Sequence, residues 1–179
     1  LESERFPGLT AKDGSYSKQE FIDLQRMGLE YGVRIIPEID IPAHSLAFAH
    51  YKPEIASRKY GMDHLDLYKK ETYQFVDSLL DEYLSGDNPV FIGDLHIGTD
   101  EYNKKEAEQY RYFTDRYLKF VEKYGKNVRM WGGLKWLPGK TPVKAEGVTV
   151  NAWSYDWVDP VVSLQDGYKL INTCDTYLY

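Results

Sequence analysis

The sequence predicts an α/β protein built on a parallel sheet, a partial (β/α)8 barrel of about five strands with intervening helices. Two observations indicate this fold class. Short apolar segments alternate with segments of helical period, and Asp, Glu, His, Trp or Tyr follows one apolar segment after another. Because the carboxyl ends of parallel strands meet at one edge, where barrels bind ligands, we expect the site there.

Five segments are predicted to be strands, because each is a short apolar run bounded by turn residues or polar side chains. They are residues 33–36, 95–98, 128–131, 148–153 and 168–172. The first continues through residue 44, and Glu38, Asp40 and His44 interrupt its apolar pattern. A purely structural loop would more often use Gly, Asn or Ser there. These three are therefore candidate site residues, although Asp40 could instead pair with an Arg and His44 could be a hydrogen-bonded wall residue.

Helices are predicted where apolar residues recur at helical spacing between capping and breaking residues. They are expected at residues 17–32, 72–85, 104–124 and 159–167, with loops at residues 1–16 and 45–71. Ser17 and Glu20 form a capping box, and Thr72 is expected to cap the second helix. The tyrosines of the third helix are expected to lie in the core.

Composition restricts the class of protein. The 179 residues, of which 42% are hydrophobic, suffice for one folded domain. The net charge of -6, with dispersed basic residues, argues against a nucleic-acid partner and favours a neutral or basic ligand. The single cysteine, Cys174, excludes an internal disulfide and a thiolate metal cluster. No apolar run approaches the ~18 residues of a membrane span, and the chain starts without Met, as an excised segment would.

Two adjacent carboxylates, Asp100 and Glu101, occupy the loop between the second strand and the third helix. Adjacent carboxylates can divide their roles, one staying ionised while the other carries a proton. The structural alternative is a helix N-cap, since acidic residues there accept backbone N–H bonds.

Aromatic residues follow the later strands. Trp131, Trp153 and Tyr177 would share one mouth with the carboxylates, a combination that suits a sugar, whose C–H faces stack on rings and whose hydroxyls bond acidic groups. A nucleotide is disfavoured because the sequence has no Gly-rich phosphate loop. Each Trp could also simply fill the barrel interior.

Five phrases in this order resemble the successive barrel motifs of family 20 glycoside hydrolases, the β-N-acetylhexosaminidases and lacto-N-biosidases. They are Ile-Pro-Glu-Ile-Asp-Ile-Pro-Ala-His at 36–44, His-Ile-Gly-Thr-Asp-Glu at 96–101, Met-Trp at 130–131, Ala-Trp at 152–153 and Asp-Thr-Tyr-Leu at 175–178. The resemblance spans nearly the whole chain. The sequences of residues 96–102 and 63–67 resemble those of bacterial members, which are often at the cell surface. An extracellular or cell-surface location in a bacterium is therefore expected.

The resemblance implies a retaining exo-glycosidase that removes terminal β-linked N-acetylhexosamine, GlcNAc or GalNAc, by substrate-assisted catalysis through an oxazolinium intermediate. Glu101 matches the general acid and base, and Asp100 matches the residue that orients the 2-acetamido group. Tyr177 matches the tyrosine that hydrogen-bonds the acetamido oxygen, while Trp131 and Trp153 match the pocket walls.

Four further residues are assigned by the resemblance. His44 and Asp40 would lie around the general acid, among the residues that bind the substrate. His96 and Glu38 would support the strand ends. No cofactor or metal is implied, and the expected partners are N-acetylhexosamine-containing oligosaccharides or glycoconjugates. The alternatives are disaccharide release of the lacto-N-biosidase type, a non-catalytic glycan-binding module, and a metal-dependent barrel hydrolase using His44, His96 and Asp40.

The sequence also departs from the usual pattern of the family. The five strands correspond to the family's third to seventh, so residues 1–179 are expected to be one segment of a catalytic domain without the first two and the last strands. An Arg of the first strand and a Trp of the eighth would be missing, and the chain alone is expected to be inactive. Residues that differ from the usual pattern are Ala43, Thr99, Gly132, Gly133 and Tyr179.

Overall fold

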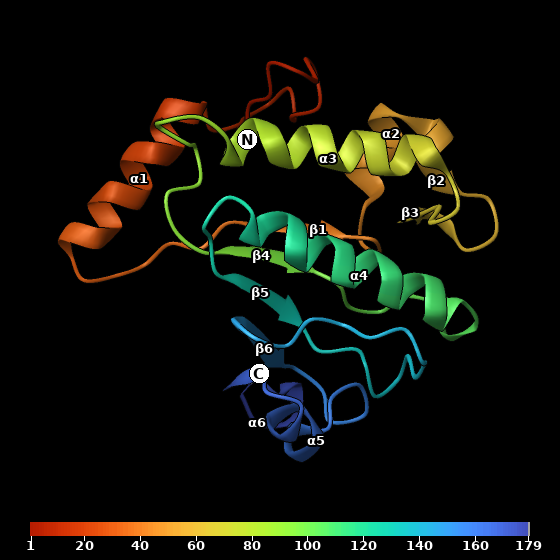
Figure 1. Ribbon diagram of the computed structural model, residues 1–179. Helices are drawn as coiled ribbons and strands as arrows, with labels where there is room; N and C mark the ends of the chain where they lie inside the picture. The colour runs from red at the N-terminus through yellow and green to blue at the C-terminus, as the bar shows by residue number, and fades with distance from the viewer. Residues whose placement is uncertain (179) are drawn as a thin grey trace.

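Five parallel strands form one sheet, in the order β1-β4-β5-β6-β7 (Figure 1). They are β1 (Glu38–Ile41), β4 (Leu95–Gly98), β5 (Val128–Trp131), β6 (Val148–Ala152) and β7 (Lys169–Asn172). The computed structural model describes residues 1–178. In the register of the sheet, His96 is opposite Glu38 on one side and Arg129 on the other. The predicted α/β class and the five parallel strands are confirmed.

Helices precede and follow the strands, except that an irregular segment joins β5 directly to β6. They are α1 (Lys18–Glu30), α2 (Leu46–Tyr51), α3 (Lys70–Leu84), α4 (Ala107–Glu122), α5 (Pro160–Gln165) and α6 (Asp175–Leu178), with 3-10 turns η1 (Pro53–Ile55) and η2 (Lys104–Glu106). In Figure 1, α3 and α4 lie side by side, and Arg116 of α4 bonds Asp77 of α3 at 2.5 Å. Within residues 1–178, no helix is long and apolar enough to cross a membrane.

The predicted capping box of α1 is confirmed, and α5 also begins with a side-chain cap. The Ser17 side chain accepts from Glu20 N–H while the Glu20 side chain accepts from Ser17 N–H, and Asp159 accepts from Val161 and Val162 N–H. The third helix does bury its tyrosines, since Tyr110 and Tyr117 are fully buried.

The predicted strand at residues 33–36 is wrong. Val33 is 55% exposed, and its N–H bonds Gly28 at 2.8 Å to close the turn after α1. Strand pairing begins only at Glu38, where β4 lies alongside. An apolar run of four residues cannot by itself distinguish a strand from an extended connection.

Two further expectations needed correction. The second helix starts at Lys70 rather than at Thr72, whose hydroxyl bonds back to Asp66 O at 2.7 Å instead of capping the helix. The predicted loop at 45–71 contains α2, η1 and a small antiparallel pair, β2 (Ala56–Ser57) with β3 (Gly61–Leu65). These elements are too short to produce a periodic pattern in the sequence.

The two faces of the sheet differ in polarity, which determines where the site lies. Side chains alternate along each strand. On β5 and β6, Val128, Met130 and Val150 are buried, while Arg129 and Trp131 are half-buried on the opposite face. The second face therefore carries the polar and aromatic side chains of the strands.

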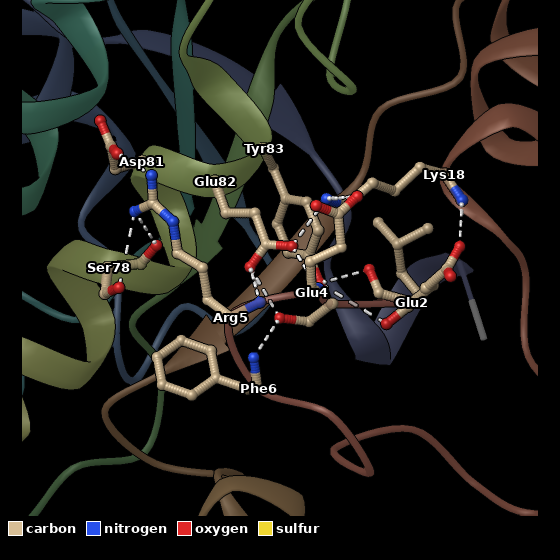
Figure 2. Close-up of polar contacts among 11 residues, drawn as sticks. Glu2, Glu4, Arg5, Phe6, Lys18, Ser78, Asp81, Glu82 and Tyr83 are labelled. Atoms are coloured by element: carbon tan, nitrogen blue, oxygen red, sulfur yellow. Dashed lines mark hydrogen bonds and ion pairs between the residues drawn. The ribbon is translucent and has the colours of Figure 1, made fainter.

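The N-terminal loop is held against α3 by a polar cluster (Figure 2). Glu82 accepts from the Ser3 hydroxyl at 2.7 Å and from Glu4 N–H at 2.6 Å, and it pairs with Lys18 at 2.8 Å. Arg5 pairs with Asp81 at 2.6 Å. Residues before α1 thus have defined contacts, although they form no regular element.

Candidate functional site

The carboxylates that follow β4 both reach one imidazole. Nε2 of His44 lies 3.4 Å from Asp100 Oδ2 and 3.1 Å from Glu101 Oε2. The Asp100 side chain is 16% exposed, whereas that of Glu101 is 48% exposed. The structure thus places a largely buried carboxylate, Asp100, beside a half-exposed one, Glu101. His44, which follows β1, contacts both.

The N-cap alternative for this pair does not hold. Asn103 caps the helical turn that precedes α4, because its side chain accepts from Lys105 N–H at 3.0 Å. The carboxylates lie before this cap and bond no helix N-terminus within the described chain.

The backbone around the pair is strained. His44, Thr99 and Glu101 have φ values of 52°, 81° and 48°, and they are the non-glycine residues with positive φ among residues 1–178. Such conformations cost ~1–3 kcal/mol each and persist only where the surrounding structure imposes them. Their concentration at one place is typical of a functional site rather than of an ordinary loop.

Asp40 and Asp100 form a carboxyl pair. Burial raises the pKa of Asp40 to about 8, with the negative charges of Asp100 and Glu38 adding to the rise. Burial also raises the pKa of Asp100. The hydrogen bond between them raises the pKa of Asp40 and opposes the rise at Asp100. With the pKa of Asp40 near 8, Asp40 carries a proton at neutral pH, and the pair does not carry two negative charges.

A cavity of about 250 Å³ opens at this point, lined by Asp40, His44, Asp100, Trp131 and Trp153. Both indoles are fixed by hydrogen bonds. Trp131 Nε1 donates to Glu38 Oε1 at 2.7 Å, and Trp153 Nε1 donates to Gly132 O at 2.9 Å. The cavity has an acidic floor and two held aromatic walls, which suits a sugar substituent.

His96 and Glu38 both contact Trp131, which forms one wall of the cavity. His96 Nδ1 accepts from Gly98 N–H at 3.1 Å, and its ring lies 4.8 Å from that of Trp131. Burial, with the charge of Arg129 adding to it, lowers the pKa of His96 to about 4. Burial raises the pKa of Glu38, against its bond from Trp131. A neutral His96 thus fixes the end of β4 through its bond from Gly98 N–H.

Tyr177 is not among the residues that line the cavity. It belongs to α6, its side chain is 71% exposed, and its ring lies 6.1 Å from that of Tyr155. Its contact with an acetamido oxygen stays a prediction. Tyr179, the departure two positions later, lies outside the described residues.

Sequence reasoning missed two residues near the site, Thr99 and Trp157. Thr99 is fully buried, its hydroxyl donates to Trp131 O at 3.3 Å, and its carbonyl accepts from the Tyr110 hydroxyl. Trp157 stands 5.5 Å from Trp153, ring centre to ring centre. Trp157 follows the carboxyl end of β6, so the rule that selected Trp153 could have found it too.

Three donor atoms could hold a cation. One from each of Asp40, His44 and Asp100 lie within 4.8 Å of one another. His96, which the metal-hydrolase alternative requires, is not in this group, and its Nδ1 is occupied by Gly98 N–H.

Comparison with known proteins identifies the family. The family model described as glycosyl hydrolase family 20, catalytic domain, matches residues 2–179. The chain belongs to glycosyl hydrolase family 20. A β-hexosaminidase of the fungus Arthroderma benhamiae is 29% identical over 209 aligned residues, covering 96% of this chain and 34% of that protein. A lacto-N-biosidase of Bifidobacterium bifidum is 25% identical, covering 88% of this chain and 16% of that protein.

Solved structures agree with this family 20 assignment. A β-N-acetylhexosaminidase of Streptomyces coelicolor matches with a TM-score of 0.74 at 26% identity, over 94% of this chain and 38% of that one. A chitobiase of Flavobacterium johnsoniae shares the fold with a TM-score of 0.76 at 24% identity, over 94% of this chain and 30% of that one. The chain spans less than half the length of these relatives.

Proposed function

We propose that the protein carrying this chain is a retaining glycoside hydrolase that releases terminal β-linked N-acetylhexosamine by substrate-assisted catalysis. The supporting observation is the cavity lined by Asp100, His44 and two tryptophans, with the Glu101 carboxylate 3.1 Å from His44. A pocket of this kind accommodates an acetamido group beside the anomeric carbon. Membership of family 20, with β-hexosaminidases among the relatives, supports the same reaction.

The first step cleaves the glycosidic bond. Glu101 donates a proton to the glycosidic oxygen while the carbonyl oxygen of the 2-acetamido group attacks C1. The C1–O bond breaks, its electrons go to the protonated leaving group, and the sugar becomes an oxazolinium ion. His44, 3.1 Å from Glu101 and 3.4 Å from Asp100, holds the two carboxylates in their separate positions.

Asp100 acts on the acetamido group. Its ionised carboxylate accepts the acetamido N–H, which orients the carbonyl oxygen toward C1 and stabilises the positive charge that develops on the ring. The proton of Asp40 keeps the pair from carrying two charges. Trp131 and Trp153 exclude water that would compete with the internal nucleophile.

The second step returns the enzyme to its starting state. Glu101, now ionised, removes a proton from a water molecule that attacks C1 from the side of the departed group. The C1–oxazolinium oxygen bond breaks, and the product keeps the β configuration.

The extracellular or cell-surface location and the choice among GlcNAc, GalNAc and lacto-N-biose stay predictions.

The test uses the longest natural form of the protein that contains this chain. Hydrolysis of nitrophenyl β-N-acetylglucosaminide is measured for the wild type, Glu101→Gln and Asp100→Asn, with exposed Glu30→Gln as a control. We expect kcat to fall about a hundredfold or more for Glu101→Gln. A thiazoline analogue of the intermediate should still bind Glu101→Gln but bind Asp100→Asn weakly. Retention of more than a tenth of wild-type kcat by Glu101→Gln would refute the assignment.

A further inference from the structure

Glu101 lines a second cavity, and His44, whose Nε2 lies 3.1 Å from the Glu101 carboxylate, lines the first. This cavity has a volume of about 510 Å³, within the ~300–1,000 Å³ range of small-molecule sites. Its walls include Glu101, Lys104, Lys105, Trp136 and Trp157. A general acid must stand between the sugar that is released and the group from which it is released. Since the proposed function places the acetamido group of the released sugar in the first cavity, the second lies on the leaving-group side.

A row of tryptophans joins the two cavities. The ring of Trp153, in the wall of the first, lies 5.5 Å from that of Trp157, and Trp157 lies 5.2 Å from Trp136 in the second. Trp136 is 40% exposed, more than a ring placed only for packing requires. Such a row provides stacking surfaces for consecutive sugar rings.

The second cavity carries positive charge in an acidic protein. Lys104 Nζ lies 4.7 Å from the centre of the Trp136 ring, and both Lys104 and Lys105 are exposed. Within residues 1–178, neither ammonium group has a carboxylate within 4.0 Å.

Acidic residues next in sequence to the lining residues of the cavity have other partners. Asp63 contacts His64 at 2.9 Å, and Glu106 pairs with Lys59 at 2.7 Å. The two lysines are therefore free to meet a negative charge in the cavity, despite a net charge of -6 for the chain.

We propose that this second cavity binds the sugar next to the cleaved bond and prefers an acidic one, such as a uronic acid, at that position. The inference rests on the proposed function, because it assigns the leaving-group side of the same reaction. The sugar ring stacks against the Trp136 and Trp157 wall, and its carboxylate pairs with Lys104 and Lys105. The contact with Trp136 keeps the Lys104 ammonium group at the cavity, so less side-chain entropy is lost on binding.

The test compares two disaccharides in the longest natural form of the protein: N-acetylglucosamine β-linked to glucuronic acid, and the same sugar β-linked to glucose. We expect kcat/KM to favour the uronate, and the double variant Lys104→Ala/Lys105→Ala to reduce that preference about three- to tenfold, as two exposed ion pairs should. Added salt should reduce it too. Lys123→Ala, which removes an equal charge from the exposed end of α4, should leave the preference unchanged.

Binding to the Glu101→Gln variant, measured by calorimetry, separates this inference from the proposed function. A uronate preference in binding that the lysine substitutions remove, without turnover by the wild type, would support the cavity assignment and reject the hydrolase. Equal kcat/KM for the two disaccharides, unchanged in the lysine variant, would reject the cavity assignment and leave the hydrolase in place. Absence of both turnover and binding would reject both.

Discussion

Gly98 and Asp40 approach each other so closely that the position allows only glycine. A Cβ atom on Gly98 would lie 1.8 Å from Asp40 Oδ1 and 2.7 Å from Asp40 Cα. The φ of 68° at Gly98 is also one that side chains disfavour. The site carboxylate on β1 thus owes its position to a missing side chain on β4.

Replacing Gly98 by Ala should therefore disturb the site and the fold together. The clash involves backbone as well as side chain, so we expect a loss of about 2–4 kcal/mol in the free energy of unfolding. Chemical denaturation measures it. Gly125→Ala is the control, because Gly125 has a similar φ of 70° but open space around its Cβ; it should lose only ~1 kcal/mol. Equal losses for the two variants would contradict a steric role for Asp40.

The carboxyl pair predicts a pH dependence of stability. The pKa of Asp40 is raised to about 8 in the folded protein, so the folded state binds more protons than the unfolded state between pH ~4 and ~8. This contribution is present in full below the unfolded pKa and is lost as the pH rises toward 8. The free energy of unfolding should fall by up to ~1 kcal/mol per pH unit between pH ~6.5 and ~8.

Asp40→Asn tests this assignment. The amide cannot ionise but can still donate a hydrogen bond to Asp100, so its denaturation midpoint should change little over the interval in which the wild type weakens. A slope that persists in Asp40→Asn would assign the titration to another group.

His96 predicts the opposite slope at lower pH. Its pKa is lowered to about 4, so from pH ~6.5 down to ~4 the unfolded state takes up a proton that the folded state does not. Stability contributed by the neutral imidazole is therefore lost as the pH falls through this range. In the wild type, the opposite pH slope from Asp40 offsets this loss of stability. The loss should therefore become visible in Asp40→Asn.

His96→Asn keeps an acceptor for Gly98 N–H and removes the titrating group. In the background of Asp40→Asn, it should flatten stability between pH ~4 and ~6.5. Denaturation curves at half-unit pH intervals measure this, and an unchanged acid slope would mean that His96 is protonated in the folded protein.

The fold was predictable where local pattern and packing agree. The capping box at Ser17 and the apolar runs at 95–98 and 128–131 are determined by nearby residues, and each appears where expected. The run at 33–36 failed because strand formation depends on a neighbour to pair with, and β4 meets the chain only from Glu38 onward. Pairing is a long-range property that a local apolar pattern does not contain.

The site was predictable in its residue types but less in its geometry. The order of polar residues along the chain places Asp40, His44 and Asp100 at one edge of a parallel sheet, and they meet there. The sequence could not show that Asp40 would hold the pair's proton, since that depends on burial and on the distance to Asp100. Nor could it show that Tyr177 would be largely exposed.

The chain by itself should be inactive, which is the last prediction. Residues 1–178 supply five parallel strands, whereas a (β/α)8 barrel closes with eight. Within these residues, β1 and β7 are edge strands, and the face that carries Glu38 and Trp131 has no barrel wall opposite it. An open site of this kind keeps water around Glu101 and Asp100, which weakens their electrostatic effect on the reacting sugar.

Nitrophenyl β-N-acetylglucosaminide separates the two cases. The purified 179-residue chain should give no turnover above that of its Glu101→Gln variant, while a longer natural form containing the same residues should give turnover that the substitution removes. If the short chain hydrolyses the substrate and Glu101→Gln abolishes that hydrolysis, closure of the barrel is not needed for catalysis. The cavity between Trp131 and Trp153 would then itself supply the exclusion of water on which the acetamido mechanism depends.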